Sequence, residues 1–221
     1  MKRVLGIDEA GRGCVLGPLV VGCFLASEGS ESALRSAGAD DSKKLTPARR
    51  VAARQRLQAL GTEDHVVITA RDIDGDNLNA LEERAILELI RRHEPDRVII
   101  DALGSPRTIP STVARLEAAA GVPILMEPKA DGTYPVVGAA SLVAKTTRDA
   151  TLDALKEAHG VLGSGYPSDP KTRAWLKAWL DTGAPWPPFV RTRWGTVREL
   201  TQQALFRPPG SGSVAGSEGT D

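Results

Sequence analysis

Residues 4–18 constrain this chain most, because they join an apolar run to two acids and a glycine-rich turn. The apolar residues at 4–7 predict a short buried strand. Asp8 and Glu9 follow at once. Adjacent strand residues point to opposite faces, so the two carboxylates can serve one site only near a strand end or a kink.

The next segment is Gly11-Arg12-Gly13. Glycines permit backbone conformations and close approaches that a Cβ atom would forbid. A carboxylate pair beside such a backbone suits a cation and a phosphate ester held side by side. An ordinary polar turn after a strand has the same composition, and this stretch alone leaves both interpretations open.

The overall composition fits a normal folded α/β domain, or a domain with a small appendage, since 221 residues are 41% apolar and 25% charged. Lys+Arg and Asp+Glu both number 28, so the chain has no global field that would attract nucleic acid. Any nucleic-acid site must therefore be a local basic patch around an acidic centre.

The cysteine content and the apolar runs indicate a cytoplasmic protein. Cys14 and Cys23 are the only cysteines, and we expect both to be reduced. No Cys/His cluster has zinc-ligand spacing. The N-terminus lacks a secretory apolar region, and no apolar run approaches the ~20 residues of a membrane span.

The hydrophobic pattern predicts a mixed α/β domain with a helical C-terminal part. Thr46-Pro47 is typical of a helix start. Residues 27–38 are a loop or a frayed helix, and 72–79 and 129–132 are polar turns. The strands are expected at 4–7, 19–25, 65–73, 96–103 and 123–126, and the helices at 47–60, 81–93, 110–120, 135–159, 170–181 and up to about 206.

Asp101 lies near the carboxyl end of the predicted strand at 96–103. Ligand sites of open α/β sheets lie beyond the carboxyl ends of strands. A carboxylate carried there by an apolar strand loses its water unless something pairs with it. A metal ion is the economical partner, and Arg107 is the structural alternative.

Four carboxylates are the candidate metal ligands and catalytic residues: Asp8, Glu9, Asp101 and Asp131. A set of oxygen ligands without His or Cys suits Mg²⁺ or Mn²⁺ rather than zinc. Several carboxylates beside phosphate-binding groups fit two-metal phosphodiester chemistry. Composition and spacing lead this far, to metal-dependent phosphoryl chemistry.

Three further features leave two interpretations open. Lys145 and Arg148 are neighbours on one helical face and form either a phosphate clamp or an exposed pair. The basic helix at 47–60 contacts nucleic acid or is merely solvated. Tyr166, between glycine and proline, suits a surface platform better than a core.

Five motifs in order resemble ribonuclease HII, and the resemblance covers roughly residues 4–196. They are Gly6-Ile-Asp-Glu-Ala-Gly-Arg-Gly with Gly17-Pro18, Asp41-Ser-Lys-Lys-Leu45, Lys129-Ala-Asp131, Ala139-Ala-Ser-Leu-Val-Ala-Lys145 and Gly163-Ser-Gly-Tyr-Pro. The Lys-Ala-Asp and Tyr-Pro-Val-Val wording is similar to the archaeal and eukaryotic branch.

The resemblance implies a ribonuclease H-like fold, a five-stranded mixed sheet flanked by helices. It implies a catalytic domain at 1–160 and a helical C-terminal subdomain at 161–206 that completes the substrate groove. We expect a disordered tail at 207–221 from its Pro, Gly, Ser and acidic composition. A monomer is expected, because no heptad pattern or exposed apolar stripe is evident.

The implied activity is endonucleolytic cleavage of RNA in RNA–DNA hybrids and of single ribonucleotides embedded in duplex DNA. The implied roles are ribonucleotide excision repair and RNA primer removal. By position, the four carboxylates match the family's metal ligands. Gly11, Arg12 and Gly13 match the segment that reads the ribose 2′-hydroxyl, and Tyr166 matches the tyrosine that stacks on the following deoxyribose.

The resemblance also implies phosphate contacts for Lys43, Lys145 and Arg148. Arg193 departs from the family's usual serine two residues after Arg191, which puts phosphate contacts there in doubt. The C-terminal Gln202-Gln-Ala-Leu205-Phe206 has only the beginning of a sliding-clamp peptide. We therefore expect weak or no clamp binding through it.

Two other classes of function stay as alternatives. A sugar kinase or actin-like ATPase also opens with an apolar strand and Ile-Asp, but needs a duplicated domain, and Glu9 fits its phosphate loop poorly. A non-catalytic nucleic-acid-binding subunit would not need all four acids. A metal-dependent cleavage assay separates these classes from a nuclease.

Overall fold

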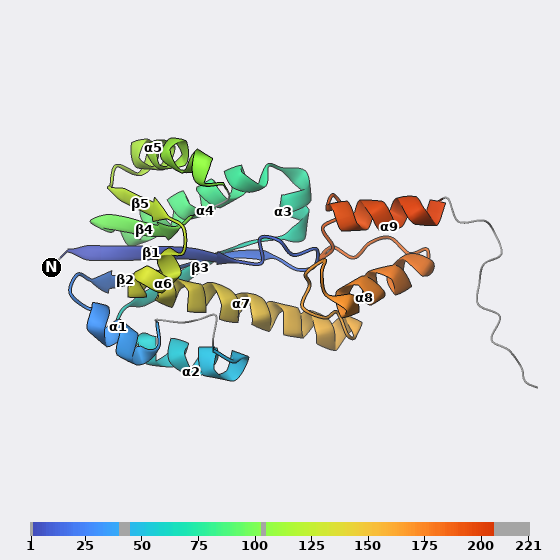
Figure 1. The fold of residues 1–221 in the computed structure, drawn as a ribbon, viewed down its shortest axis with the longest axis horizontal. Coiled ribbons are helices and arrows are strands. Elements are labelled where there is room, and N and C mark those ends of the chain that lie inside the picture. Colours follow the sequence, from blue (N-terminus) through green and yellow to red (C-terminus); the bar gives the residue numbers. More distant parts are fainter. Residues whose placement is uncertain (1, 40–44, 103–104, 206–221) are drawn as a thin grey trace, which may run out of the picture.

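The structure, a computed structural model, describes residues 2–39, 45–102 and 105–205. A five-stranded sheet lies at its centre and is covered by helices on both faces (Figure 1). The strands are β1 (Arg3–Ala10), β2 (Leu19–Ser27), β3 (Thr62–Ile68), β4 (Arg97–Asp101) and β5 (Ile124–Glu127).

The strand order is β3-β2-β1-β4-β5, and the sheet is mixed. β2 runs antiparallel to both β1 and β3. β1, β4 and β5 are mutually parallel, so their carboxyl ends meet at one edge of the sheet. The predicted five-stranded mixed sheet is confirmed.

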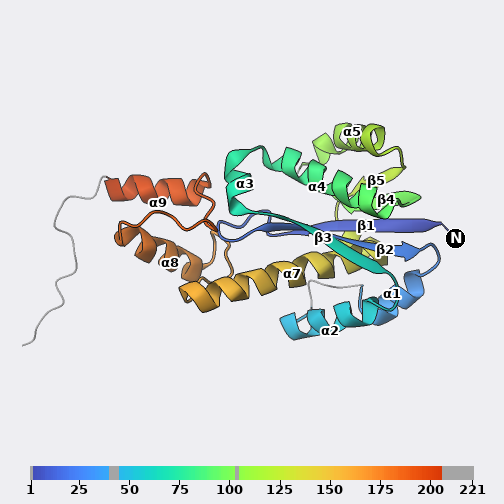
Figure 2. The same cartoon turned by 180° about the vertical axis from the view of Figure 1, so that it is seen from behind.

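The helices flank the sheet, and α7 runs beneath it along β1 and β2 (Figures 1 and 2). α4 and α5 cover the opposite face. No helix in the described ranges is long and apolar enough to cross a membrane. The helices are α1 (Glu31–Ala37), α2 (Pro47–Leu57), α3 (Ala70–Gly75), α4 (Leu78–His93), the 3-10 turn η1 (Pro106–Thr108), α5 (Ile109–Ala120), α6 (Ala130–Thr133), α7 (Pro135–His159), α8 (Pro170–Asp181) and α9 (Gly195–Leu205).

Strand β1 contributes to the core on both faces of the sheet. Leu5 and Ile7 pack in the cluster that includes α4 and α5, while Val4 packs with α1, α2 and α7. Gly6 lies against the start of α7, and a Cβ there would be 2.2 Å from the carbonyl oxygen of Val136. The small residues at the start of α7 therefore pack directly on the sheet.

One expected strand is wrong at its end. The strand predicted at 65–73 stops at Ile68, and α3 follows at once. Thr69 caps α3: its Oγ1 accepts a hydrogen bond from the N–H of Asp72 at 3.2 Å, and Asp72 accepts from the N–H of Thr69 at 2.9 Å. This reciprocal capping box starts a helix where the apolar pattern alone predicted extended chain.

Two polar turns also differ from the expectation. The turn expected at 129–132 includes the one-turn helix α6. The segment at 27–38 contains α1, which agrees with the helix that was one of the two alternatives there. The turn expected at 72–79 is divided between the end of α3 and the start of α4, which Asn77 caps. The side-chain caps of Thr69 and Asn77 explain why α3 and α4 form around this last segment.

The C-terminal helices lie beyond the carboxyl end of β1 (Figure 1). They pack around their own cluster, which includes Leu176, Phe189 and Val197. Val15 and Leu16, from the loop after β1, belong to the same cluster. The division at residue 160 stays a prediction, and the tail predicted at 207–221 lies outside the described residues.

Candidate active site

Three of the four predicted carboxylates meet at the carboxyl edge of the sheet. Asp8, Asp101 and Asp131 each offer an oxygen, and these atoms all lie within 4.8 Å of one another. Ile7 pairs with Ile100 across the parallel ladder, so the next residue of each strand is one of these acids. Backbone register, rather than a chance contact, brings Asp8 beside Asp101.

The third acid arrives on α6, which Asp101 itself helps to hold. The N–H of Ala130 donates to Asp101 Oδ1 at 3.0 Å. Lys129, just before it, has φ 62°, in the left-handed region. A residue other than glycine held there costs about 1 to 3 kcal/mol. The strained turn and the hydrogen bond together place Asp131 beside the two strand acids.

The environment of Asp8 disfavours its negative charge in the absence of a cation. Burial, opposed by the Ser141 hydroxyl and reinforced by Asp101, raises the pKa of Asp8 to about 6. Lys145 lowers it and donates from Nζ to Ser141 Oγ at 2.7 Å. A divalent cation would relieve the remaining repulsion, and an all-oxygen donor set fits a hard ion.

Glu9 lies beside the trio but is not part of the group within 4.8 Å found among the described residues. Its N–H donates to Asp8 Oδ1 at 2.8 Å. Burial, and then the charge of Asp8, raise the pKa of Glu9 to about 8. Its role as a fourth ligand stays a prediction.

A cavity of about 350 Å³ is lined by Glu9, the neighbour of Asp8 in the chain, whereas Asp8, Asp101 and Asp131 are not among its lining residues. It brings together most of the predicted substrate-binding residues, from the loop after β1, from α7 and from the segment before α8. Lys43 lies outside the described residues. The lining residues are Glu9, Ala10, Gly11, Arg12, Gly13, Arg50, Lys145, Arg148, Asp149 and Tyr166.

All three residues of the loop Gly11-Arg12-Gly13 line this cavity. Gly11 has φ 91°, and a Cβ there would be 2.6 Å from the carbonyl oxygen of Pro18. Within the described ranges, the N–H groups of Arg12 and Gly13 donate to no protein acceptor. Two backbone donors therefore remain for a ligand in the cavity.

The side chain of Arg12 is paired with residues of α4. It forms an ion pair with Glu82, which is fully buried on α4, and donates to Asn79 Oδ1 at 2.6 Å. Sequence reasoning missed Glu82. The available signal was an acid at 82, on the helical face that also carries Ala85, Ile86 and Leu89.

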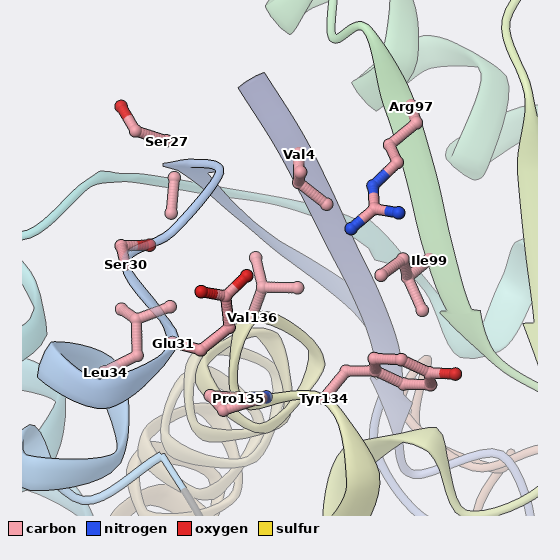
Figure 3. A pocket seen from close by; sticks show the side chains of 11 residues that line it. Val4, Ser27, Ser30, Glu31, Leu34, Arg97, Ile99, Tyr134, Pro135 and Val136 are labelled. Carbon is pink, nitrogen blue, oxygen red and sulfur yellow. The ribbon is translucent and has the colours of Figure 1, made fainter. Parts of the chain in front are cut away.

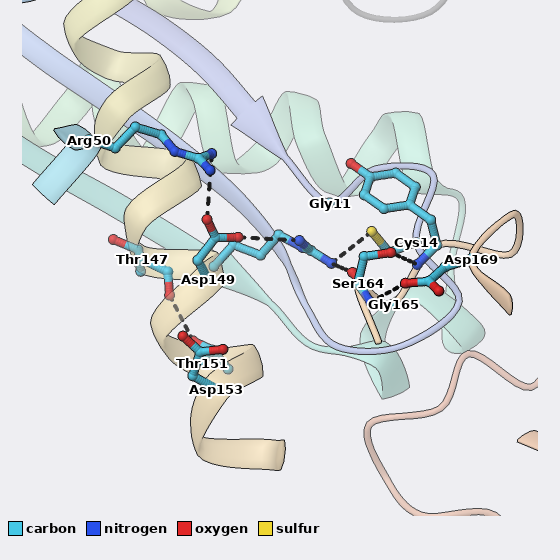
Figure 4. Close-up of polar contacts among 12 residues, drawn as sticks. Gly11, Cys14, Arg50, Thr147, Asp149, Thr151, Asp153, Ser164, Gly165 and Asp169 are labelled. Carbon is cyan, nitrogen blue, oxygen red and sulfur yellow. Dashed lines mark hydrogen bonds and ion pairs between the residues drawn. The ribbon is translucent and has the colours of Figure 1, made fainter. Parts of the chain in front are cut away.

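Arg148 supports the segment that carries Tyr166. It is 6% exposed, and its guanidinium donates to Cys14 Sγ at 3.0 Å and to the carbonyl of Ser164 at 2.7 Å (Figure 4). The same group lies 5.4 Å from the centre of the Tyr166 ring. Asp149 faces both Arg148 and Arg50, each at 3.5 Å. A phosphate contact for Arg148 stays a prediction.

Tyr166 is 41% exposed, as expected of a surface platform. Lys145, also predicted to bind phosphate, lies one helical turn before Arg148 and lines the same cavity. The structure therefore brings both cations and the tyrosine to one cavity, which Glu9 also lines. Which atoms of a substrate they touch stays a prediction.

Arg191 was not assigned a role from the sequence, yet it is fully buried under the loop. Its guanidinium donates to the carbonyls of Gly11 at 2.7 Å, Arg12 at 2.9 Å and Gly17 at 3.1 Å. Arg193, the departure noted in the sequence, is exposed, and its N–H donates to Asp74 at 3.1 Å.

A second hollow lies at the opposite, amino-terminal end of β1 and β4 (Figure 3). Val4, Arg97 and Tyr134 are among its lining residues, and its volume is about 30 Å³. That volume is about the share of one water molecule in the liquid. The cavity beside the carboxylates is the candidate site.

Comparison with known proteins decides the family. The family model described as Ribonuclease HII matches residues 5–197. The chain belongs to the ribonuclease HII family. Ribonuclease HII of Aeropyrum pernix is 41% identical over 209 residues, which cover 90% of this chain and 91% of the relative. The Archaeoglobus fulgidus enzyme is 40% identical over 205 residues, or 90% and 97% of the two chains.

Solved structures of ribonuclease HII proteins agree with this assignment. Ribonuclease H2 from Pyrococcus horikoshii superposes with a TM-score of 0.85 at 34% identity, covering 93% of this chain and all of that one. Ribonuclease HII in the PCNA complex of Archaeoglobus fulgidus gives 0.81 at 39% identity, covering 89% and 96%. This member of the ribonuclease HII family is therefore a ribonuclease, an endonuclease for the RNA of RNA–DNA hybrids.

Proposed function

We propose that this ribonuclease cuts on the 5′ side of a single ribonucleotide embedded in duplex DNA, as well as in longer hybrids. The products would be a 3′-hydroxyl and a 5′-phosphate. One observation carries the proposal: Arg12 and Gly13, whose N–H groups donate to no acceptor among the described residues, line a cavity that Glu9 and Lys145 also line. A sugar hydroxyl bound there would place its neighbouring phosphate near the acids.

Asp8, Asp101 and Asp131, with Glu9, would hold two Mg²⁺ or Mn²⁺ ions. Their all-oxygen donor set, burial and mutual repulsion fit such ions. When bound, the ions supply activation of a water and stabilisation of the leaving oxygen. The buried carboxylates fix where that chemistry takes place.

The remaining residues would select and orient the substrate. The loop N–H groups would donate hydrogen bonds to the ribose 2′-hydroxyl oxygen, and this hydroxyl is the group that distinguishes RNA from DNA. Tyr166 would stack on the next deoxyribose, and Arg148 holds the segment that carries it. Lys43, Lys145 and Arg148 would contact phosphates, which position a duplex without reading its base sequence.

The test is cleavage of a duplex with one ribonucleotide, with the cut mapped at nucleotide resolution in Mg²⁺ and in Mn²⁺. We expect a single cut on the 5′ side of the ribonucleotide and no cut in the all-DNA duplex. A cut at the 3′ side, or cleavage only of long hybrids, would contradict the proposal. Comparison of the two ions gives the preferred metal.

The proposed substrates suit ribonucleotide excision repair and RNA primer removal by a cytoplasmic monomer. A ribonucleotide in duplex DNA is a lesion in the first process and a primer remnant in the second. The monomer is tested by light scattering with and without a ribonucleotide-containing duplex. A mass of two chains in the absence of duplex would contradict it.

We further propose weak or no sliding-clamp binding through the C-terminal segment. The Archaeoglobus fulgidus relative was solved as a PCNA complex. In this chain Gln202 and Gln203 lie on α9, whereas the following residues from 206 on lie outside the described ranges. Titration of the full chain with a PCNA-type clamp tests this: micromolar or tighter binding that deletion of 202–221 abolishes would overturn it.

A further inference from the structure

We propose that Arg191 is a positioning residue that makes the Gly11-Arg12-Gly13 loop selective for a ribose 2′-hydroxyl. The inference rests on the proposed function, since it explains how that loop would read the sugar. Arg191 would touch no substrate. It would act from behind, by fixing the orientation of two peptide groups.

The first step is the geometry of the peptide unit. The carbonyl of Gly11 and the N–H of Arg12 belong to one planar trans peptide, as do the carbonyl of Arg12 and the N–H of Gly13. In each unit the C=O and N–H point in opposite directions. Arg191 binds both of these carbonyls, at 2.7 and 2.9 Å. The N–H groups of Arg12 and Gly13, two residues that line the cavity, are therefore turned away from Arg191.

The second step is that only a guanidinium can do this. Arg191 makes three hydrogen bonds to three carbonyls, because it also binds Gly17 at 3.1 Å. The planar guanidinium carries five N–H donors in a fixed fork, whereas a lysine ammonium is a compact charge with three. A lysine at 191 would keep the charge but lose the arrangement of three simultaneous bonds.

The third step is that Arg191 is itself held in place. Its N–H donates to the carbonyl of Val15 at 2.9 Å, and its guanidinium lies 5.0 Å from the centre of the Trp194 ring. Asp74, in α3, accepts from the N–H groups of Thr192 at 2.6 Å and Arg193 at 3.1 Å. Burial lowers the pKa of Arg191 to about 10, so the group remains charged at neutral pH.

The test compares Arg191→Lys with Arg193→Lys as the matched control two residues away. Two duplexes are used, one with a single ribonucleotide and one with a 2′-fluoro nucleotide at the same position. The readout is the ratio of the two kcat/KM values, in which the amount of folded enzyme cancels. We expect the ratio to fall about tenfold in Arg191→Lys, as expected when one or two hydrogen bonds are misaligned, and to stay unchanged in Arg193→Lys.

Rescue and a second variant keep the inference falsifiable. Guanidinium ion added to Arg191→Ala should restore the ratio toward that of the wild type. If neither variant folds, Asp74→Ala loosens the support of Arg191 and should lower the ratio by a smaller factor. An unchanged ratio in a folded Arg191→Lys protein, or in Asp74→Ala where that is used, would overturn the role of Arg191.

The same data separate this inference from the proposed function. A wild-type enzyme that cleaves the ribo and 2′-fluoro duplexes equally would refute reading of the hydroxyl itself. A selective wild type with an equally selective Arg191→Lys variant would refute only the positioning role.

Discussion

The two halves of the candidate site are held in different ways. The carboxylates stand on β1 and β4, where ladder register fixes their separation, and on α6, which hydrogen bonds to Asp101. The Gly11-Arg12-Gly13 loop has no ladder. Side chains from distant parts of the chain hold it: Glu82 on α4 and Arg191 near the C-terminus. The contrast shows that backbone pairing is enough to position side chains on a strand, whereas the position of this loop depends on side chains from other parts of the chain.

The halves also differ in charge. The carboxylate half gathers like charges that a cation would neutralise, and the pKa values of Asp8 and Glu9 are raised. The loop half contains buried cations whose donors are used on backbone carbonyls and on an acid. We therefore expect the first half to respond to metal and pH, and the second to substitutions that disturb the backbone.

The largest effect is expected on the carboxylate side. Asp101→Asn keeps the shape but removes one charged ligand, and should lower the cleavage rate at least about a thousandfold while hybrid binding is retained. Asp96→Asn, in the residue just before the same strand begins, is the control and should cleave normally. Rate and affinity are measured on one labelled hybrid. Full activity in Asp101→Asn would contradict the metal assignment.

The next effect is expected in the loop. Gly11→Ala places a Cβ 2.6 Å from a carbonyl oxygen in a residue with φ 91°, so the loop must move. We expect the rate of cleavage at a single ribonucleotide to fall about a hundredfold, because a substrate displaced by about 1 Å reacts more slowly by about that factor. Gly29→Ala has nearly the same φ, 90°, with nothing within 4 Å of the added Cβ. Gly29→Ala should lower the stability through backbone strain but leave the activity unchanged. Equal losses of activity in the two variants would refute a specific role for the loop.

The carboxylate half should make the free energy of unfolding depend on pH, whereas we expect no such dependence from the loop half. The folded pKa of Asp8 is raised to about 6, so its contribution to stability is full below about pH 4 and is lost as pH rises through 6. The loss is roughly 2 to 3 kcal/mol for metal-free protein, and Glu9, raised to about 8, extends it upward. Mg²⁺ or Mn²⁺ should raise the melting temperature more at pH 8 than at pH 5, because protons compete with the ion.

Thermal unfolding in EDTA and in Mn²⁺ across this window provides the measurement. Asp8→Asn should flatten the pH dependence of the metal-free protein. Asp169, whose pKa is lowered to about 2 by its bonds to Ser164, acts below this window and does not mask the effect. Metal-free stability that rises between pH 5 and pH 8 would have the wrong sign.

The smallest effect is expected at Tyr166. Ala removes the ring and should slow cleavage at a single ribonucleotide about tenfold, in line with the 1 to 3 kcal/mol of an aromatic platform. Phe keeps the ring above the Arg148 guanidinium and should retain most of the rate. Continuous hybrids serve as the comparison substrate. Equal rates for Ala and wild type at the junction would show that the tyrosine only covers the surface.

The hydrophobic periodicity predicted helices and strands correctly where the signal lay within or next to a single element. The strand at 4–7, the long helix at 135–159 and the helix at 170–181 could be predicted because their periodicity and caps lie within the element. The expected strand at 65–73 was wrong at its end, because the Thr69 and Asp72 cap outweighed an apolar pattern. Arg12 was singled out for its motif, but its partner on α4 could not be read from the sequence.

The sequence by itself determined that acids would stand at the carboxyl ends of β1 and β4, since strand periodicity is local and the ends of parallel strands meet at one edge. Only the tertiary structure decided that Asp131 completes the trio, and that Arg191 reaches carbonyls 174 to 180 residues earlier. The reason is physical. A hydrogen bond between segments far apart in the chain produces no periodic pattern in the sequence. A charged residue is expected at the surface unless the tertiary structure shows buried partners for it.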